Sequence, residues 1–209
     1  MTRLLRRLAR CTSAASAAEM ALVMPLLLLL LFGIIDAGRL MWEFNEAEKA
    51  TQAGVRYAVV TDPVLGGTSS STGLYNYSFS LSGGITQGTA VPTTSFDTAT
   101  CTNGACTCLP GGGFCSGTAY NATAFTNLVT RMSKMYPQIK ASNVQIQYKN
   151  VGLGFAGDPD GPDVSPLVTV SLTGMQFHPL SCLVFACSIG MPDFRAGLTL
   201  EDASGTVSN

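Results

Sequence analysis

Cysteine is the residue type in this sequence whose chemistry is easiest to anticipate. The 209-residue chain has seven cysteines, of which Cys11 stands alone near the N-terminus. The other six follow residue 100, and their spacings lack the paired short intervals of a structural zinc site. In an oxidising compartment we therefore expect disulfides, with every pairing left open. The six candidates are Cys101, Cys106, Cys108, Cys115, Cys182 and Cys187.

The pair Cys182 and Cys187 encloses an apolar stretch, Leu-Val-Phe-Ala. A disulfide between them would close this stretch into a small loop. The favoured interpretation is that its apolar side chains belong to the protein core. The alternative is a disulfide-held contact with a partner or with the membrane surface.

The other reactive groups do not form a catalytic or metal-binding pattern. The single histidine, His178, has no recognisable nucleophile with it, and residues 113–117 have the spacing of a nucleophile elbow without the strand expected before it. The acids of residues 158–163 resemble a calcium loop weakly, because two prolines interrupt the pattern, and a solvated turn is favoured. Residues 202–206 are expected to be a frayed tail. We expect no enzyme activity, no metal and no cofactor.

The N-terminal part of the chain has the pattern of a membrane anchor. Residues 1–14 contain four arginines and no acid, and residues 20–35 are all uncharged and mostly apolar. With its start at Ala15, the apolar helix would be about 31 Å long, enough to cross a hydrocarbon core. Basic residues before a span stay in the cytoplasm, so the chain after the span is expected outside. Glu19 is the one charge in residues 15–35.

The leader, the small residues 13–18, Glu19 and the apolar run together resemble the signal of a class III prepilin. The stretch AAEMALVMPLLLLLLFGIIDAGRLMWEFNEAEKATQAGVRYAV resembles the N-terminal segment of TadE-like proteins. This resemblance implies that a prepilin peptidase cuts between Ala14 and Ala15, which places Glu19 at mature position +5. The released amino group would lie one helical turn from Glu19 and could neutralise it within the chain or on a neighbouring subunit. Resemblance to pilins favours the neighbouring subunit.

The resemblance also implies a function. It is that of a non-catalytic minor pseudopilin in the Tad (tight adherence, Flp) system, which is type IV pilus-like and supports surface adhesion and biofilm formation. The implied partners are the prepilin peptidase, other pseudopilins, the major pilin, the inner-membrane Tad assembly platform and membrane lipid. A net charge of −1 gives no indication of nucleic-acid binding. The alternative is an uncleaved bitopic periplasmic binding module.

A continuous helix is expected over residues 15–60, with the transmembrane part at about 20–37, because Asp62 and Pro63 are the first strong terminators. One face of this helix is defined by residues spaced three or four apart. Packing of that face on the protein's own domain is favoured, and packing between subunits is the alternative. The face consists of Leu40, Phe44, Ala47, Thr51, Gly54 and Ala58.

The remainder predicts a small α+β domain, pilin-like and stapled by disulfides. Residues 1–14 would be a cytoplasmic leader, and residues 61–118, rich in Gly, Ser and Thr, a loop region with short strands at about 75–81. Residues 119–209 would form the periplasmic α+β domain, with a helix over 118–136. Alternation of apolar and polar residues predicts three strands of an antiparallel sheet, around Ile146, Val170 and Leu198. The protein is expected in the inner (cytoplasmic) membrane as a single-pass chain, with this domain in the periplasm or in the extracellular pilus.

Overall fold

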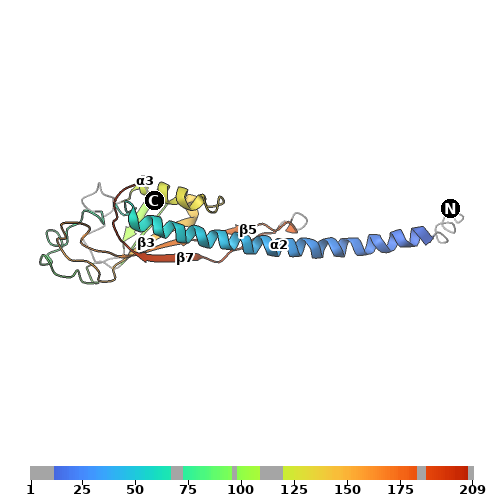
Figure 1. The fold of residues 1–209 in the computed structure, drawn as a ribbon, viewed down its shortest axis with the longest axis horizontal. Helices are drawn as coiled ribbons and strands as arrows, with labels where there is room; N and C mark the ends of the chain where they lie inside the picture. Colours follow the sequence, from blue (N-terminus) through green and yellow to red (C-terminus); the bar gives the residue numbers. More distant parts are fainter. Residues whose placement is uncertain (1–11, 67–72, 96–97, 109–119, 183–186, 207–209) are drawn as a thin grey trace. The chain divides into compact units, whose positions relative to one another are not determined.

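The computed structural model describes residues 12–66, 73–95, 98–108, 120–182 and 187–206, with side chains from residue 16 onward (Figure 1). The chain divides into two compact units. One comprises Met1–Glu43 and Gln176–Ile189, and the other comprises Phe44–Met175 and Gly190–Asn209. Each unit is described by itself.

Helix α2 (Thr12–Val60) is the longest element, with 49 residues. It contains one proline, Pro25, which removes a single backbone hydrogen bond in the apolar run. No other strong breaker occurs before Pro63, so the helix continues to Val60. At its C-terminal end the Thr61 hydroxyl donates to the carbonyl of Tyr57 at 2.8 Å. Val60 is also the last residue of the helix expected from the sequence.

Among the described residues, five strands form one antiparallel sheet. The order across this sheet is β2-β1-β3-β4-β7. A separate short hairpin pairs β5 with β6. The strands are β1 (Thr98–Thr102), β2 (Ala105–Cys108), β3 (Val144–Lys149), β4 (Leu167–Leu172), β5 (Gln176–Phe177), β6 (Ile189–Gly190) and β7 (Phe194–Thr199).

Strands β3 and β4 show why alternation predicts this sheet. Ile146 lies opposite Val170 and Tyr148 opposite Val168, and all four side chains are fully buried on one face. Burial raises the pKa of the Tyr148 phenol, so its oxygen stays neutral and accepts the amide of Val64 at 2.9 Å. The α+β class with an antiparallel sheet is therefore confirmed.

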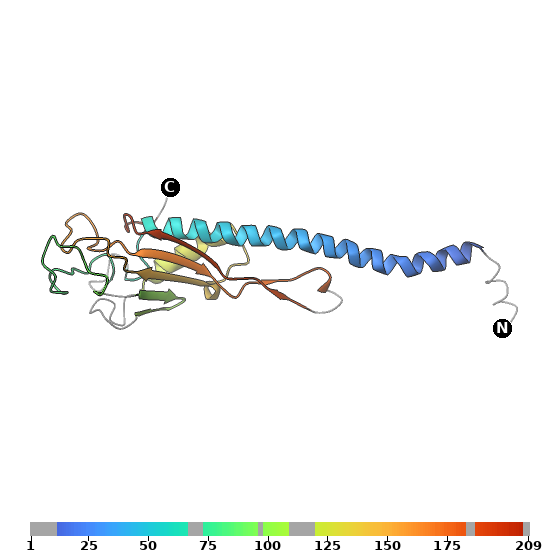
Figure 2. The same cartoon turned by 90° about the horizontal axis from the view of Figure 1, so that it is seen from below.

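Residues 44–60 of α2 and helix α3 (Ala122–Ser133) cover the apolar face of the sheet within the second unit (Figure 2). Gly54 of α2 shows how closely they pack. A Cβ atom at Gly54 would lie 2.8 Å from Cγ of Met132 in α3 and 3.4 Å from Cγ1 of Val170 in β4. The missing side chain lets the three elements meet at this point.

Helix α3 begins and ends inside the range expected for it. The side chain of Asn121 accepts the amide of Ala124 at 3.1 Å and caps the N-terminus, so the helix starts at Ala122 and not at residue 118. Its buried face includes Phe125, Leu128 and Met132. A short 3-10 helix, η1 (Ala141–Asn143), leads from this part of the chain into β3.

The region expected as loop, residues 61–118, contains more structure than its composition indicates. The hairpin of β1 and β2 lies within it, and Leu74, Phe79 and Val91 are buried. Turns and irregular backbone occupy residues 75–81, so the short strands expected there are wrong. Apolar side chains spaced by small residues thus give this region a core without regular strands at 75–81.

The segment expected to fray, residues 202–206, is tied to the end of α2. Asp62 and Gly205 exchange two hydrogen bonds of 2.8 Å, one of them from the Gly205 amide to the Asp62 carboxylate. The Tyr57 hydroxyl donates to the carbonyl of Thr206 at 2.6 Å, and Ala203 is fully buried. The expectation of a frayed segment is wrong here because these contacts satisfy its backbone groups.

Candidate functional site

The predicted processing site lies at the start of α2. Ala14 and Ala15 are in the first turn of the helix, and Glu19 follows Ala15 by four residues. Glu19 is exposed. A carboxylate at this spacing can meet an α-amino group at Ala15, or one supplied by another chain, because residues four apart lie on the same helix face.

The apolar run after Glu19 is left uncovered by the described parts of the chain. Leu22 is 73% exposed and Leu30 is 67% exposed. The helix is long and apolar enough to cross a membrane, with a mean hydropathy of 2.5 in its most apolar window, none of which is buried. An apolar surface of this extent marks contact with lipid or with other apolar helices.

Residues 14–56 match the family model of TadE-like proteins. The TadE-like segment contains Glu19 and the apolar run, and it reaches Arg56 in the part of α2 that packs on the sheet. The resemblance stated from these residues is confirmed. No curated protein and no solved structure matches the chain.

The TadE-like segment suggests a protein associated with the Tad pilus. The single described helix that is suited to a bilayer is consistent with a single-pass membrane protein. Both statements rest on the same stretch of sequence, since the apolar run of residues 20–35 lies within the matched segment.

Most of the predicted packing face of α2 belongs to the second unit, which begins at Phe44. Ala47, Thr51, Gly54 and Ala58 are buried, whereas Phe44 is 37% exposed. The Phe44 ring meets the ring of Phe194 edge-on, with 4.9 Å between their centres. Leu40, the remaining member of this face, is half-buried. The small residues are therefore buried within the unit to which they belong, and packing between subunits stays a prediction for the rest of the helix.

Two disulfides lie within the described residues. Cys101 and Cys106 are directly opposite each other on β1 and β2 and join the two strands. Cys182 and Cys187 close the loop in the hairpin between β5 and β6. Cys108 is disulfide-bonded as well, whereas Cys115 and residues 183–186 lie outside the described residues.

Asp36 is a site residue that the sequence did not single out. Its side chain is buried, and one carboxylate oxygen accepts the amide of Leu180 at 2.6 Å. The other oxygen accepts the amide and the hydroxyl of Ser181 at 2.9 and 2.8 Å. Arg39 lies 3.6 Å from the same carboxylate. The sequence feature that could have pointed to Asp36 is an acid directly after an apolar run, with the first opposite charge one helical turn later.

Arg39 extends this cluster along the first unit. Its guanidinium lies 3.4 Å from the Glu43 carboxylate and 5.4 Å from the centre of the Phe177 ring. It also donates to the carbonyl of His178 at 3.5 Å. His178 thus contributes its main-chain carbonyl here. Its imidazole is exposed, and among the described residues no hydrogen bond joins it to a Ser, Thr or Cys side chain.

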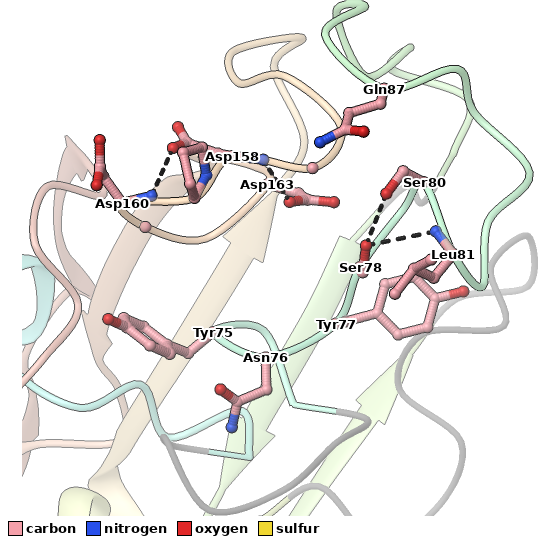
Figure 3. Close-up of a pocket in the computed structure, with 13 residues that line it drawn as sticks. Tyr75, Asn76, Tyr77, Ser78, Ser80, Leu81, Gln87, Asp158, Asp160 and Asp163 are labelled. Atoms are coloured by element: carbon pink, nitrogen blue, oxygen red, sulfur yellow. Dashed lines mark hydrogen bonds between the residues drawn. The ribbon is translucent and has the colours of Figure 1, made fainter.

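Asp163 fixes a polar cleft between two loops of the second unit (Figure 3). Its buried carboxylate accepts the amide of Phe79 at 2.6 Å and the amide of Asp158 at 3.1 Å. The cleft has a volume of about 440 Å³. Hydroxyl, amide and carboxylate side chains line it, including Asn76, Ser78, Ser80, Gln87, Asp158 and Asp160.

Two acids of this cleft, Asp158 and Asp163, bind the backbone of the loops. Asp158 accepts the amide of Asp160 at 3.0 Å, as in a turn, and Asp163 joins two loops. Within the part of the chain that the structure describes, no group of three His, Cys, Asp or Glu side chains is placed to hold a metal ion. The residues 113–117, with the spacing of a nucleophile elbow, lie outside that part.

Proposed function

We propose that this protein is a minor pseudopilin of the Tad pilus, held in the inner membrane by α2 before and during assembly. The observation that carries the proposal is the TadE-like segment at residues 14–56, in which an exposed apolar helix follows a lone carboxylate. The protein would be a substrate of a prepilin peptidase, which would cut it between Ala14 and Ala15. Its other partners would be the assembly platform, the major pilin and further pseudopilins.

The proposed mechanism is assembly by pairing of charges in an apolar environment. Cleavage would give Ala15 a free amino group, which is positively charged near neutral pH. On insertion beside another helix, this amine and a Glu19 carboxylate on the neighbouring chain would neutralise one another. An unpaired carboxylate costs about 2.5–3.5 kcal/mol at the bilayer centre on insertion scales and less toward the interface, so pairing becomes more favourable the deeper Glu19 lies in the assembled arrangement.

The protein would act without catalysis. TadE-like proteins are typically non-catalytic, and the described cleft carries carboxylates that are used to fix loop backbone. Adhesion and biofilm formation would then follow from the pilus to which the protein contributes. The second candidate, an uncleaved periplasmic binding module with the same anchor, is favoured by the polar cleft at Asp163.

A photo-crosslinking amino acid in place of Leu22 tests the proposal in the bacterium that makes the protein. Leu22 is 73% exposed on the apolar part of α2. We expect adducts with other pilin-type subunits, because the mechanism brings apolar helices together. The matched probe replaces Gln52, which is exposed on α2 beyond the apolar run. Adducts with lipid alone at position 22 would contradict assembly and support the simple anchored module.

A further inference from the structure

The hairpin around β5 and β6 is held at one particular level of α2. Phe177 and His178 contact Arg39, and Leu180 and Ser181 bond to Asp36, one helical turn earlier. Successive hairpin residues therefore reach successively earlier residues of the helix. The segment from 177 to 181 runs toward the apolar part of α2, within the first unit (Figure 2).

Asp36 marks the place where the apolar run of α2 stops. It is the first ionisable residue after residues 20–35, and Arg39 and Glu43 follow it. The rise from Asp36 to Glu43 is about 10 Å, since each helical residue adds about 1.5 Å. If α2 spans a bilayer, as the proposed function requires, the hydrocarbon must end close to Asp36, because charged side chains are costly inside it.

The contacts at Asp36 explain how a carboxylate can be tolerated at this boundary. A buried carboxylate is destabilising unless hydrogen-bond donors and opposite charge surround it. Leu180 and Ser181 supply three donors, and Arg39 supplies the charge. The hairpin therefore satisfies Asp36, and Asp36 in turn holds the hairpin at the boundary.

Apolar side chains are exposed along the stretch of the first unit that includes Asp36 to Glu43 and the hairpin. Met41 and Trp42 are each 68% exposed, Ile189 is 47% exposed and Leu180 is 39% exposed. Tryptophan is enriched where a membrane protein meets the lipid headgroups, because its ring is apolar and its N–H is polar. We call these four residues, Met41, Trp42, Leu180 and Ile189, the collar.

We propose that the collar seats in the headgroup layer of the bilayer, so that the hairpin forms a second lipid contact beside the spanning helix. Asp36 is the positioning residue for this contact, since it fixes the hairpin to the helix. The collar would bind the lipid interface itself, which is apolar just below the headgroups and polar above them. The inference rests on the proposed function, because it needs α2 to be inserted.

Tryptophan fluorescence of the full-length protein in vesicles of phosphatidylcholine and phosphatidylglycerol tests the proposal. Trp42 is the chain's single tryptophan, so the unaltered protein reports on α2. The variant Trp42→Phe/Leu180→Trp reports on the hairpin. We expect both to be quenched by lipids brominated near the headgroup more than by deep-brominated lipids or by iodide present on both sides. The control Trp42→Phe/Lys49→Trp places the reporter about 10 Å beyond Trp42 and about 20 Å beyond Asp36 along α2, and it should respond to iodide alone.

Addition of Asp36→Asn to the hairpin reporter should release the hairpin, with a loss of lipid quenching at position 180 and a gain of iodide quenching. Lipid quenching of Trp42 together with iodide quenching at position 180 would overturn the collar and leave the membrane anchor of the proposed function intact. Shielding of position 180 from both quenchers would also overturn it, because a protein partner would then cover the hairpin. Failure of the unaltered protein to float with the vesicles would overturn the anchor and the collar together.

Discussion

Glu19→Ala is expected to leave the protein in the membrane and remove it from assembled pili. The apolar run that inserts into the bilayer is unchanged, so membrane extraction should need detergent as before. The partner amine in a neighbouring chain would lose its carboxylate, and breaking one side of a desolvated charge pair costs about 2–5 kcal/mol. Recovery in sheared pili should therefore fall roughly 30-fold or more relative to the membrane fraction.

The control for this experiment is Glu48→Ala. Glu48 is an exposed acid on the same helix, beyond the apolar run. Its removal alters net charge by the same amount without touching the predicted pair, so pilus recovery should stay close to that of the unaltered protein. Equal incorporation of Glu19→Ala and Glu48→Ala would contradict the pairing of Glu19 with a neighbouring amine.

Asp163→Ala should strongly destabilise the loops of the second unit. Asp163 accepts two backbone amides in a buried position, and a hydrogen bond to a charged group contributes about 1.5–3 kcal/mol. The free energy of unfolding should fall by roughly 3–6 kcal/mol, since both amides would lose their acceptor. Urea unfolding of the detergent-solubilised protein, followed by circular dichroism, measures this change.

Asp160→Ala provides the matched control for the loop prediction. Asp160 lies on the same turn, but its side chain is exposed, so its loss should change the free energy of unfolding by no more than about 0.5 kcal/mol. Faster amide exchange at Phe79 and Asp158 in Asp163→Ala would locate the damage at the two bonds. An unfolding curve unchanged from that of the parent protein would show that Asp163 does not fix the cleft.

The elements that the sequence predicted well are those whose signal is local. α2 follows from an apolar run and a long stretch without breakers before Pro63. β3 and β4 follow from the alternation of apolar and polar residues, because the apolar residues of each strand lie on the same face of the sheet. The TadE-like segment also depends on contiguous residues, which is why Glu19 and the apolar helix could be recognised together.

The elements that the sequence did not predict depend on partners far along the chain. β1 alternates threonines with Ala99 and Cys101, whose small side chains give only a weak apolar pattern, and it pairs with β3 more than 40 residues later. Asp36 finds Leu180 at a separation of 144 residues. Asp163 likewise bonds to Phe79 across 84 residues. Hydrogen bonds of this kind leave no periodic trace, so spacing rules cannot locate them.

The intact mass of the protein extracted from its native membranes tests the central claim most directly. The account predicts a chain that begins at Ala15, still in the membrane fraction, because the peptidase would remove residues 1–14 and leave α2 in place. N-terminal sequencing would confirm the same residue. A membrane-bound chain that retains the arginines of residues 1–14 would contradict the pseudopilin assignment and favour the uncleaved anchor.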